Sequence, residues 1–131
     1  MDYYATLIHK VKKLIAQLNI YLRKFPSYER HALCQQIRES AYRVFTLIVE
    51  GDKRFKKKTT LTNLNIEHEK LRMLLYVAFE EGYFSWESKK HGQRAKPAQS
   101  EVDRRYTTVS TMVDEIGRMI GGWIGYEAKN A

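Results

Sequence analysis

Residues 7–22 read LIHKVKKLIAQLNIYL, and the spacing of their apolar side chains decides the fold class of the chain. The large apolar residues recur every three or four positions, at Leu7, Val11, Leu14, Leu18 and Leu22, with Ile15 beside them. This spacing puts them on one face of an α-helix, where residues three and four apart lie above one another. We predict a helix over residues 2–24 that ends before Pro26, since the residue preceding a proline avoids helical geometry.

Three further segments show the same spacing and predict helices over residues 27–50, 60–81 and 100–128. Their apolar rows are Leu33, Ile37, Ala41, Val44 and Ile48; Leu61, Leu64, Leu71, Leu75 and Ala78; and Val109, Met112, Ile116, Ile120 and Trp123. For the second helix, Ser27 is the predicted N-cap and Gly51 the predicted C-cap.

The connections between these segments indicate the topology. No segment alternates apolar and polar residues between hairpin turns, so we expect no strands. Gly82 is predicted to end the third helix, and the polar stretch 88–99, with Gly92 and Pro97, is expected to be a flexible basic loop. Amphipathic helices joined by short connections favour an all-α, up-down-up-down four-helix bundle. We expect this bundle to form a single domain over residues 1–131.

The composition is that of a globular, basic protein. The 131 residues are 44% hydrophobic and carry a formal net charge of +8. This charge favours anionic partners, and RNA, DNA, an acidic protein or an anionic membrane all satisfy it. Cys34 is the single cysteine and cannot form an internal disulfide, which predicts a reducing, cytoplasmic location. Because no apolar run approaches ~20 residues and no basic region precedes an apolar core at the N-terminus, we expect neither a membrane span nor a signal peptide.

Few residues offer catalytic or metal-binding chemistry. A di-iron site in a helical bundle needs Glu-x-x-His pairs, and none of the 4 histidines has an acidic residue three positions before it. No glycine-rich phosphate loop is present. His31 and Cys34 are three positions apart, which leaves a small enzyme with a cysteine nucleophile as one hypothesis. The alternative is a surface histidine beside a buried thiol. We expect no catalytic residues, no metal and no cofactor.

The densest charge in the chain lies between the second and third predicted helices. Five basic residues occur within six positions, with Phe55 among them: Lys53, Arg54, Lys56, Lys57 and Lys58. Each cation that neutralises a phosphate releases counterions, so such a run is typical of a nucleic-acid contact, and Phe55 is able to stack on a base. The alternative is a solvated connection between two helices.

The up-down topology extends this candidate surface. The second connection lies at the same end as both termini, and Lys10, Lys12 and Lys13 lie early in the first helix, toward that end. We therefore predict one basic surface formed by these lysines and the run at 53–58. A second basic group lies at the opposite end: Lys89, Lys90, Arg94 and Lys96. One compact footprint cannot easily use both groups. Either one of them is merely a solvated group, or the surface runs along the bundle through Arg43, Arg72 or Arg118.

The last predicted helix carries glycines four positions apart, at Gly117, Gly121 and Gly125. Each glycine inside a helix costs about 1 kcal/mol relative to alanine, so three on one face suggest that another backbone approaches closely. This face lies on a different side of the helix from its apolar row and is expected to point outward. We predict an oligomer or partner interface there. A fraying C-terminal helix is the alternative.

Several stretches resemble a known superfamily of helical bundles. Residues 25–30 (FPSYER), 36–41 (QIRESA) and 48–51 (IVEG) resemble the "four helix bundle protein" superfamily. That superfamily includes proteins encoded in intervening sequences of large-subunit ribosomal RNA. Residues 114–124 (DEIGRMIGGWI) resemble one branch, the accessory variability determinant (Avd) proteins of diversity-generating retroelements. The resemblance extends over about residues 7–126.

The resemblance implies a basic bundle that assembles into a homopentameric barrel, associates with the retroelement's reverse transcriptase and binds RNA or DNA. It implies a role in mutagenic complementary-DNA synthesis and retrohoming, without catalytic residues. Some members carry basic residues one turn apart on the third helix. Here Leu71-Arg72 matches the first of them, whereas Tyr76 occupies the second position. The alternative within the superfamily is a ribosomal intervening-sequence-type bundle protein with an RNA-binding or unknown role.

Overall fold

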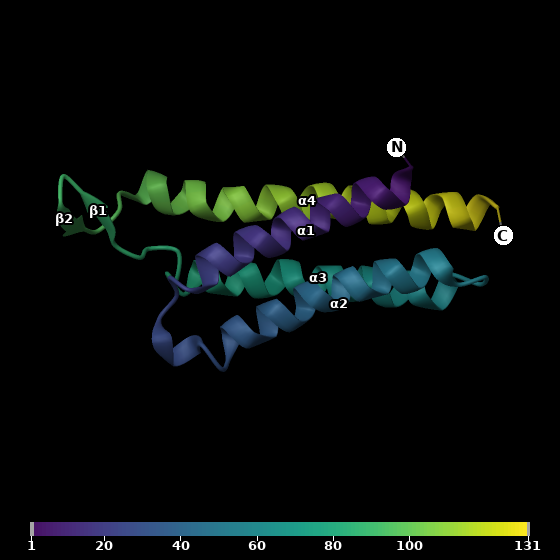
Figure 1. Cartoon of the computed structure of the whole chain (residues 1–131), viewed down its shortest axis with the longest axis horizontal. Coiled ribbons are helices and arrows are strands. Elements are labelled where there is room, and N and C mark those ends of the chain that lie inside the picture. The colour runs from purple at the N-terminus through teal and green to yellow at the C-terminus, as the bar shows by residue number, and fades with distance from the viewer. Residues whose placement is uncertain (1, 131) are drawn as a thin grey trace.

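The computed structural model describes residues 2–130, and over this range the chain forms four long α-helices. They are α1 (Tyr3–Leu22), α2 (Leu33–Lys53), α3 (Lys58–Glu80) and α4 (Gln99–Lys129). The shorter elements are the 3-10 helix η1 (Ser27–Glu29) and the strands β1 (Ser88–Lys90) and β2 (Gln93–Ala95). Figure 1 shows the helices running in alternating directions along one long axis. The predicted all-α, up-down-up-down four-helix bundle is confirmed.

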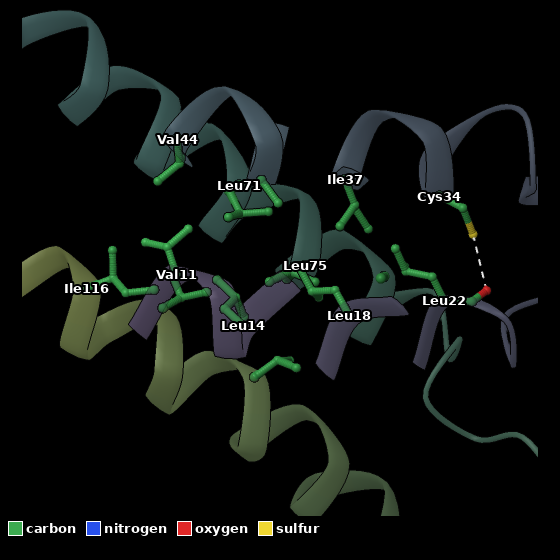
Figure 2. Packing of buried hydrophobic residues seen from close by; sticks show 14 of the residues in the cluster. Val11, Leu14, Leu18, Leu22, Cys34, Ile37, Val44, Leu71, Leu75 and Ile116 are labelled. Carbon is green, nitrogen blue, oxygen red and sulfur yellow. Dashed lines mark hydrogen bonds between the residues drawn. The ribbon is translucent and has the colours of Figure 1, made fainter. Parts of the chain in front are cut away.

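The core fills the space between the four helices. Helix α1 packs against α2 and α4, and α3 packs against the same two helices from the opposite side. In Figure 2, Val11, Leu14 and Leu18 of α1 point toward the region that also holds Leu71 and Leu75 of α3. All five apolar residues predicted for the α1 row are buried. Because fully burying a leucine stabilises a fold by about 1.5–3 kcal/mol, such rows dominate its stability. Within the described range, no helix is both long and apolar enough to cross a membrane.

The end of α3 forms as predicted. Gly82 adopts a positive φ of 79°, a conformation that glycine takes without steric cost. The Gly82 N–H donates to the carbonyl of Phe79 at 3.0 Å, and the Tyr83 N–H donates to the carbonyl of Ala78 at 2.9 Å. These two bonds form a Schellman motif, which satisfies carbonyls that have no partner inside the helix.

The start of the second helix differs from the prediction. Ser27 does not cap a long helix; it begins the short η1, and α2 starts only at Leu33. Glu29 bridges this break, because one carboxylate oxygen accepts the Leu33 N–H at 3.4 Å and the other accepts the Tyr83 hydroxyl at 2.6 Å. A carboxylate shared between two elements holds the turn after Pro26 in place, which local capping rules do not capture.

Gly51 does not end α2, contrary to the prediction. The helix continues through this residue to Lys53, and Gly51 is buried inside it. A Cβ atom at Gly51 would lie 2.9 Å from the ring of Trp123, so the glycine makes room for this side chain of α4. The apolar row of α4 shifts accordingly. Val113 is fully buried, whereas Met112 and Trp123 are only partly buried.

The loop between α3 and α4 contains a β-hairpin, so the expectation of no strands is wrong at this place. Strands β1 and β2 pair antiparallel, with Ser88 opposite Ala95 and Lys90 opposite Gln93. The two residues between them, His91 and Gly92, have positive φ values of 55° and 80°. Two such residues form the tight turn whose twist matches a hairpin. All six strand residues are exposed, so no apolar alternation marks the hairpin in the sequence.

Candidate nucleic-acid interface

The basic run occupies the connection between α2 and α3. Lys53 is the last residue of α2 and Lys58 is the first residue of α3, so residues 54–57 cross from one helix to the other. Figure 1 shows this connection at the end of the bundle that also holds both termini. The η1 segment and the hairpin lie at the opposite end. The topology therefore separates the two basic groups as predicted.

Lys57 points into the connection rather than away from it. Its Nζ donates to the carbonyl oxygens of Gly51 at 2.6 Å, Asp52 at 3.0 Å and Arg54 at 2.7 Å. The ammonium group thus satisfies carbonyls at the C-terminal end of α2, where a positive charge also opposes the helix dipole. With all three of its donors engaged, Lys57 has a structural role in the connection and is the least available of the five cations for a phosphate.

The other cations of the run remain accessible. Lys53 lies 4.0 Å from Asp52, and Arg54 lies 3.9 Å from Glu50. Ion pairs this long between exposed side chains contribute about 0–1 kcal/mol, so a phosphate competes with them easily. Within residues 2–130, no carboxylate lies within 4.0 Å of the amine of Lys56 or Lys58. The connection thus presents cations with few internal partners.

The lysines of α1 do not merge with this run into one compact patch. Lys10 pairs with Glu115 of α4 at 3.2 Å. On α4, Glu115 lies about 12 Å along the helix from Trp123, and Trp123 covers Gly51 near the end of α2. Lys10 therefore lies about 12 Å from Gly51 along the bundle axis. Lys12 and Lys13 are exposed, and no ion pair joins them to another described residue. The predicted surface is therefore divided into two groups at different levels along the bundle axis.

Arg72 is the candidate most strongly engaged with a carboxylate. Its guanidinium forms two hydrogen bonds of 2.7 Å with the carboxylate of Glu69, one turn earlier on α3. The hydrogen bond from Arg72 lowers the pKa of Glu69, so the pair stays charged at neutral pH. Arg72 also lies about 21 Å along the helix from Lys58. A continuous basic path along α3 would have to displace this intramolecular pair.

The basic hairpin at the opposite end is anchored by a buried arginine that the sequence reading missed. Arg105 of α4 is 3% exposed. Its Nη1 donates to the carbonyl oxygens of Phe84 at 2.9 Å and Trp86 at 2.8 Å. Its guanidinium carbon lies 4.2 Å from the centroid of the Trp86 ring, a cation–π contact. Residues 104–105 read as a charged surface pair in the sequence, which gives no signal that one of them turns inward.

The three glycines of α4 divide into two kinds. A Cβ atom at Gly117 would lie 2.6 Å from the ring of His68, which is buried and hydrogen-bonded through Nε2 to the carbonyl of Val113 at 2.8 Å. Gly117 thus packs against α3 and does not point outward as expected. At Gly121 and Gly125 a Cβ atom would meet no other described atom within 4 Å. These two glycines face outward, and their role in an interface stays a prediction.

Two further surface features were not predicted from the sequence. The outer side of α3 exposes a row of apolar side chains: Ile66, Met73, Tyr76 and Val77. An open groove of about 830 Å³ lies between the α2–α3 connection and the last turns of α4. It is lined by Phe55, Lys56, Lys57, Lys58, Leu61, Thr62, Ile124, Glu127, Ala128 and Asn130. Residues more than 60 positions apart build this groove, so the sequence alone does not reveal it.

The cysteine hypothesis has little support in the geometry. Cys34 is buried, and its Sγ lies 3.7 Å from the carbonyl oxygen of Leu22, as Figure 2 shows. Burial raises the pKa of the Cys34 thiol, which disfavours the thiolate that a nucleophile requires. His31 is exposed and precedes the start of α2, and no hydrogen bond joins it to Cys34 within the described range. The pair therefore resembles a surface histidine beside a small buried side chain.

Comparison with protein-family models matches residues 6–104 to the family described as bAvd-like. The match covers more than half of the chain and includes most of α1, all of α2 and α3, the hairpin and the first residues of α4. The predicted resemblance to Avd proteins is thereby confirmed. The glycine-bearing half of α4 lies beyond the matched residues. Comparison with curated proteins gives no match.

Proposed function

The chain belongs to the bAvd-like family and is an accessory protein of the Avd type, and we propose that it serves a diversity-generating retroelement by binding nucleic acid and a reverse transcriptase. In this role it has no catalytic residues of its own and supports mutagenic complementary-DNA synthesis and retrohoming. Its single cysteine, which cannot form an internal disulfide, favours action in the reducing cytoplasm.

The observation that carries the nucleic-acid part of the proposal is the α2–α3 connection. Lys56 and Lys58 project from it without a carboxylate partner in the described part of the chain, while Lys53 and Arg54 make only long, exposed ion pairs. Cations in this state neutralise phosphates and release counterions without first breaking a strong pair. Such contacts fix the position of a nucleic acid and carry little sequence information. The proposed binding is therefore tolerant of sequence and sensitive to salt.

The protein partner in this proposal is the reverse transcriptase of the same retroelement. A polymerase holding an RNA template offers an anionic surface together with its own protein contacts. The net charge of +8 accelerates encounter with such a complex through long-range attraction. Co-purification of the chain with the reverse transcriptase, before and after nuclease treatment, tests this part. Recovery that survives nuclease treatment supports a direct protein contact, and recovery lost with the nucleic acid removes it.

The proposal includes a homo-oligomer, with five copies as the Avd resemblance implies. Two features of this chain support self-association. Gly121 and Gly125 offer a surface without side chains on α4, and the row formed by Ile66, Met73 and Val77 exposes apolar area on α3. Native mass spectrometry of the wild type and of Gly121→Leu tests this part. A pentamer that Gly121→Leu weakens is expected. A monomer in both proteins would remove the oligomer.

The experiment that tests the nucleic-acid part is fluorescence anisotropy with labelled RNA and with an RNA/DNA hybrid across a salt series. We expect the logarithm of the affinity to fall linearly with the logarithm of the salt concentration, by about 0.7–0.9 per phosphate contact. Several contacts should therefore give a steep slope. Failure to bind either probe at low salt would mean that the positive charge serves a protein partner instead.

A further inference from the structure

Phe55 is the most exposed large apolar residue of the described chain, at 96%. Leaving a phenylalanine in water forgoes the stabilisation that its burial would bring, and an isolated aromatic ring at the tip of a connection is a ready contact for a flat partner. The ring borders the groove of about 830 Å³ between the α2–α3 connection and α4. Small-molecule pockets have volumes of about 300–1,000 Å³, so the groove has room for at least one nucleotide.

The connection holds Phe55 in this outward position through its own hydrogen bonds. Lys57 Nζ donates to three carbonyls of the connection, one of them the carbonyl of Arg54, directly before Phe55. Beyond it, the hydroxyl of Thr60 donates to the carboxylate of Glu50 at 2.8 Å, which joins the first turn of α3 to the last turns of α2. A connection whose backbone is held in this way loses little backbone freedom on binding.

The groove combines apolar and cationic sides. Leu61, Ile124 and Ala128 line it, and the amines of Lys56 and Lys58 lie on the side of the connection. An aromatic ring beside cations is the arrangement by which proteins bind single strands, where bases stack on rings and phosphates contact the charges. A duplex keeps the faces of its bases stacked on one another, so only its two terminal base pairs offer Phe55 a face to contact.

We propose that this groove seats an unstacked base of single-stranded nucleic acid. Phe55 contacts the face of the base, and Lys56 and Lys58 contact the flanking phosphates. The inference rests on the proposed function and deepens it, because it names the form of the nucleic acid that the α2–α3 end selects. Single strands and loops are preferred over a duplex of equal length.

Glu127 determines which side of the groove the phosphates of the strand occupy. Glu127 belongs to α4 and lines the groove together with the lysines of the connection. A phosphate near Glu127 would be repelled, so the backbone passes over Lys56 and Lys58 and the base points toward α4. A base edge with an exocyclic amino group can donate to the carboxylate. Glu127→Gln should raise the affinity for a uracil-only single strand, since uracil has no such amino group.

The test compares Phe55→Ala with wild type on a labelled single-stranded RNA and on a duplex of the same length. Removing the ring should weaken single-strand binding by roughly 5- to 150-fold, the range expected for one lost stacking contact. Duplex binding should change by less than about twofold, because only phosphate contacts hold it. Phe55→Tyr should retain most of the affinity. Since Phe55 is almost fully exposed, neither variant disturbs the core.

Tyr126→Ala is the matched control, since Tyr126 is an exposed aromatic residue of the same end that does not line the groove. It should leave both affinities unchanged. If Phe55→Ala binds both probes like wild type while Lys56→Glu/Lys58→Glu weakens both, the groove proposal is overturned and the proposed nucleic-acid binding stands. If wild type binds neither probe at low salt, both fail. If Phe55→Ala loses only the reverse transcriptase, the groove takes a protein segment and the single-strand proposal is overturned.

Discussion

The two ends of the bundle have similar compositions and use them in opposite ways. Both the α2–α3 connection and the hairpin are rich in lysine and arginine, and both have aromatic residues nearby. At the hairpin end, Phe84 is buried, and the guanidinium of Arg105 lies over the ring of the partly buried Trp86. At the other end, Phe55 is exposed and does not cover the exposed lysines next to it. The aromatic rings at the hairpin end stabilise the fold, whereas the ring at the α2–α3 end is exposed to solvent.

This contrast shows that the number of basic residues in a segment does not identify a binding surface. The two ends differ in which of their cations reach backbone carbonyls or aromatic rings of the same chain. Arg105 and Lys57 both donate to backbone carbonyls and thereby hold their segments in place. Their sequence neighbours Arg104 and Lys56 are exposed. Pairs of adjacent cations with opposite roles therefore offer the sharpest tests.

The largest expected effect is that of Arg105→Ala. It removes the hydrogen bonds to the carbonyls of Phe84 and Trp86, the ion pair with Glu101 and the contact with the Trp86 ring, so we expect a loss of about 2–4 kcal/mol in the free energy of unfolding. Arg104→Ala is the matched control, because Arg104 pairs with the same Glu101 but is exposed. It should cost at most about 1 kcal/mol. Urea denaturation measures both, and equal losses would remove the distinction between the two arginines.

The second test extends the inward–outward contrast to the glycines of α4. Gly117→Ala forces a Cβ atom against the hydrogen-bonded ring of His68 and should destabilise the fold by about 1–3 kcal/mol, despite the better helix propensity of alanine. Gly121→Ala meets open space and should stabilise the isolated chain by up to about 1 kcal/mol. Thermal unfolding of both variants measures these signs. A stabilising Gly117→Ala would show that His68 moves freely.

Lys57→Met should lower the free energy of unfolding by less than Arg105→Ala or Gly117→Ala. It retains the aliphatic stem but leaves three carbonyls at the end of α2 without their donor, so we expect a cost of about 1–2 kcal/mol. Lys56→Met should change the free energy of unfolding by less than about 0.5 kcal/mol and should reduce the affinity for RNA. The reverse assignment, with Lys56 stabilising and Lys57 binding, would contradict the geometry of the connection.

The smallest effect is a pH dependence at the hairpin end. Hydrogen bonding from Arg104, followed by the nearby charges of Arg104 and Arg105, lowers the pKa of Glu101 from 4.5 to about 2. A carboxyl whose pKa is lowered by folding contributes stability that is present above pH 4.5 and is lost as the pH falls toward 2. Glu101→Gln should therefore lessen the fall in stability over this window. NMR titration of Glu101 in Arg104→Ala should give a higher pKa, and an unchanged value would remove this cause.

The sequence predicted those parts of the molecule that depend on local periodicity. The α1 row and the closing turn at Gly82 follow from spacing and residue type, and both are confirmed. It did not predict the roles of Gly51 and Gly117, because each depends on a ring from a distant helix: Trp123 for one and His68 for the other. Propensity favours a cap at a glycine near a helix end, and tertiary packing overrides this preference.

The candidate site shows the same division. The run at 53–58 and its place at the end with the termini followed from composition and topology. The engagement of Lys57, Lys10 and Arg72 did not, since each meets partners that only the folded chain brings near it. The hairpin was missed because all six strand residues are exposed and carry no apolar alternation. A sequence therefore predicts helical spacing more reliably than it predicts whether a single charged side chain points toward a partner in the fold or toward solvent.

The most direct measurement of the central claim compares charge reversals of equal size at the two ends. RNA binding across a salt series is measured for Lys56→Glu/Lys58→Glu and for Lys89→Glu/Lys90→Glu, so that net charge changes equally in both. If the α2–α3 end binds nucleic acid, the first variant loses affinity and its salt slope falls by about 0.7–0.9 per lost contact. The second stays within about twofold of wild type at physiological salt, where distant charges are screened. Equal losses, or a larger loss from the hairpin variant, would contradict the assignment of binding to the α2–α3 end.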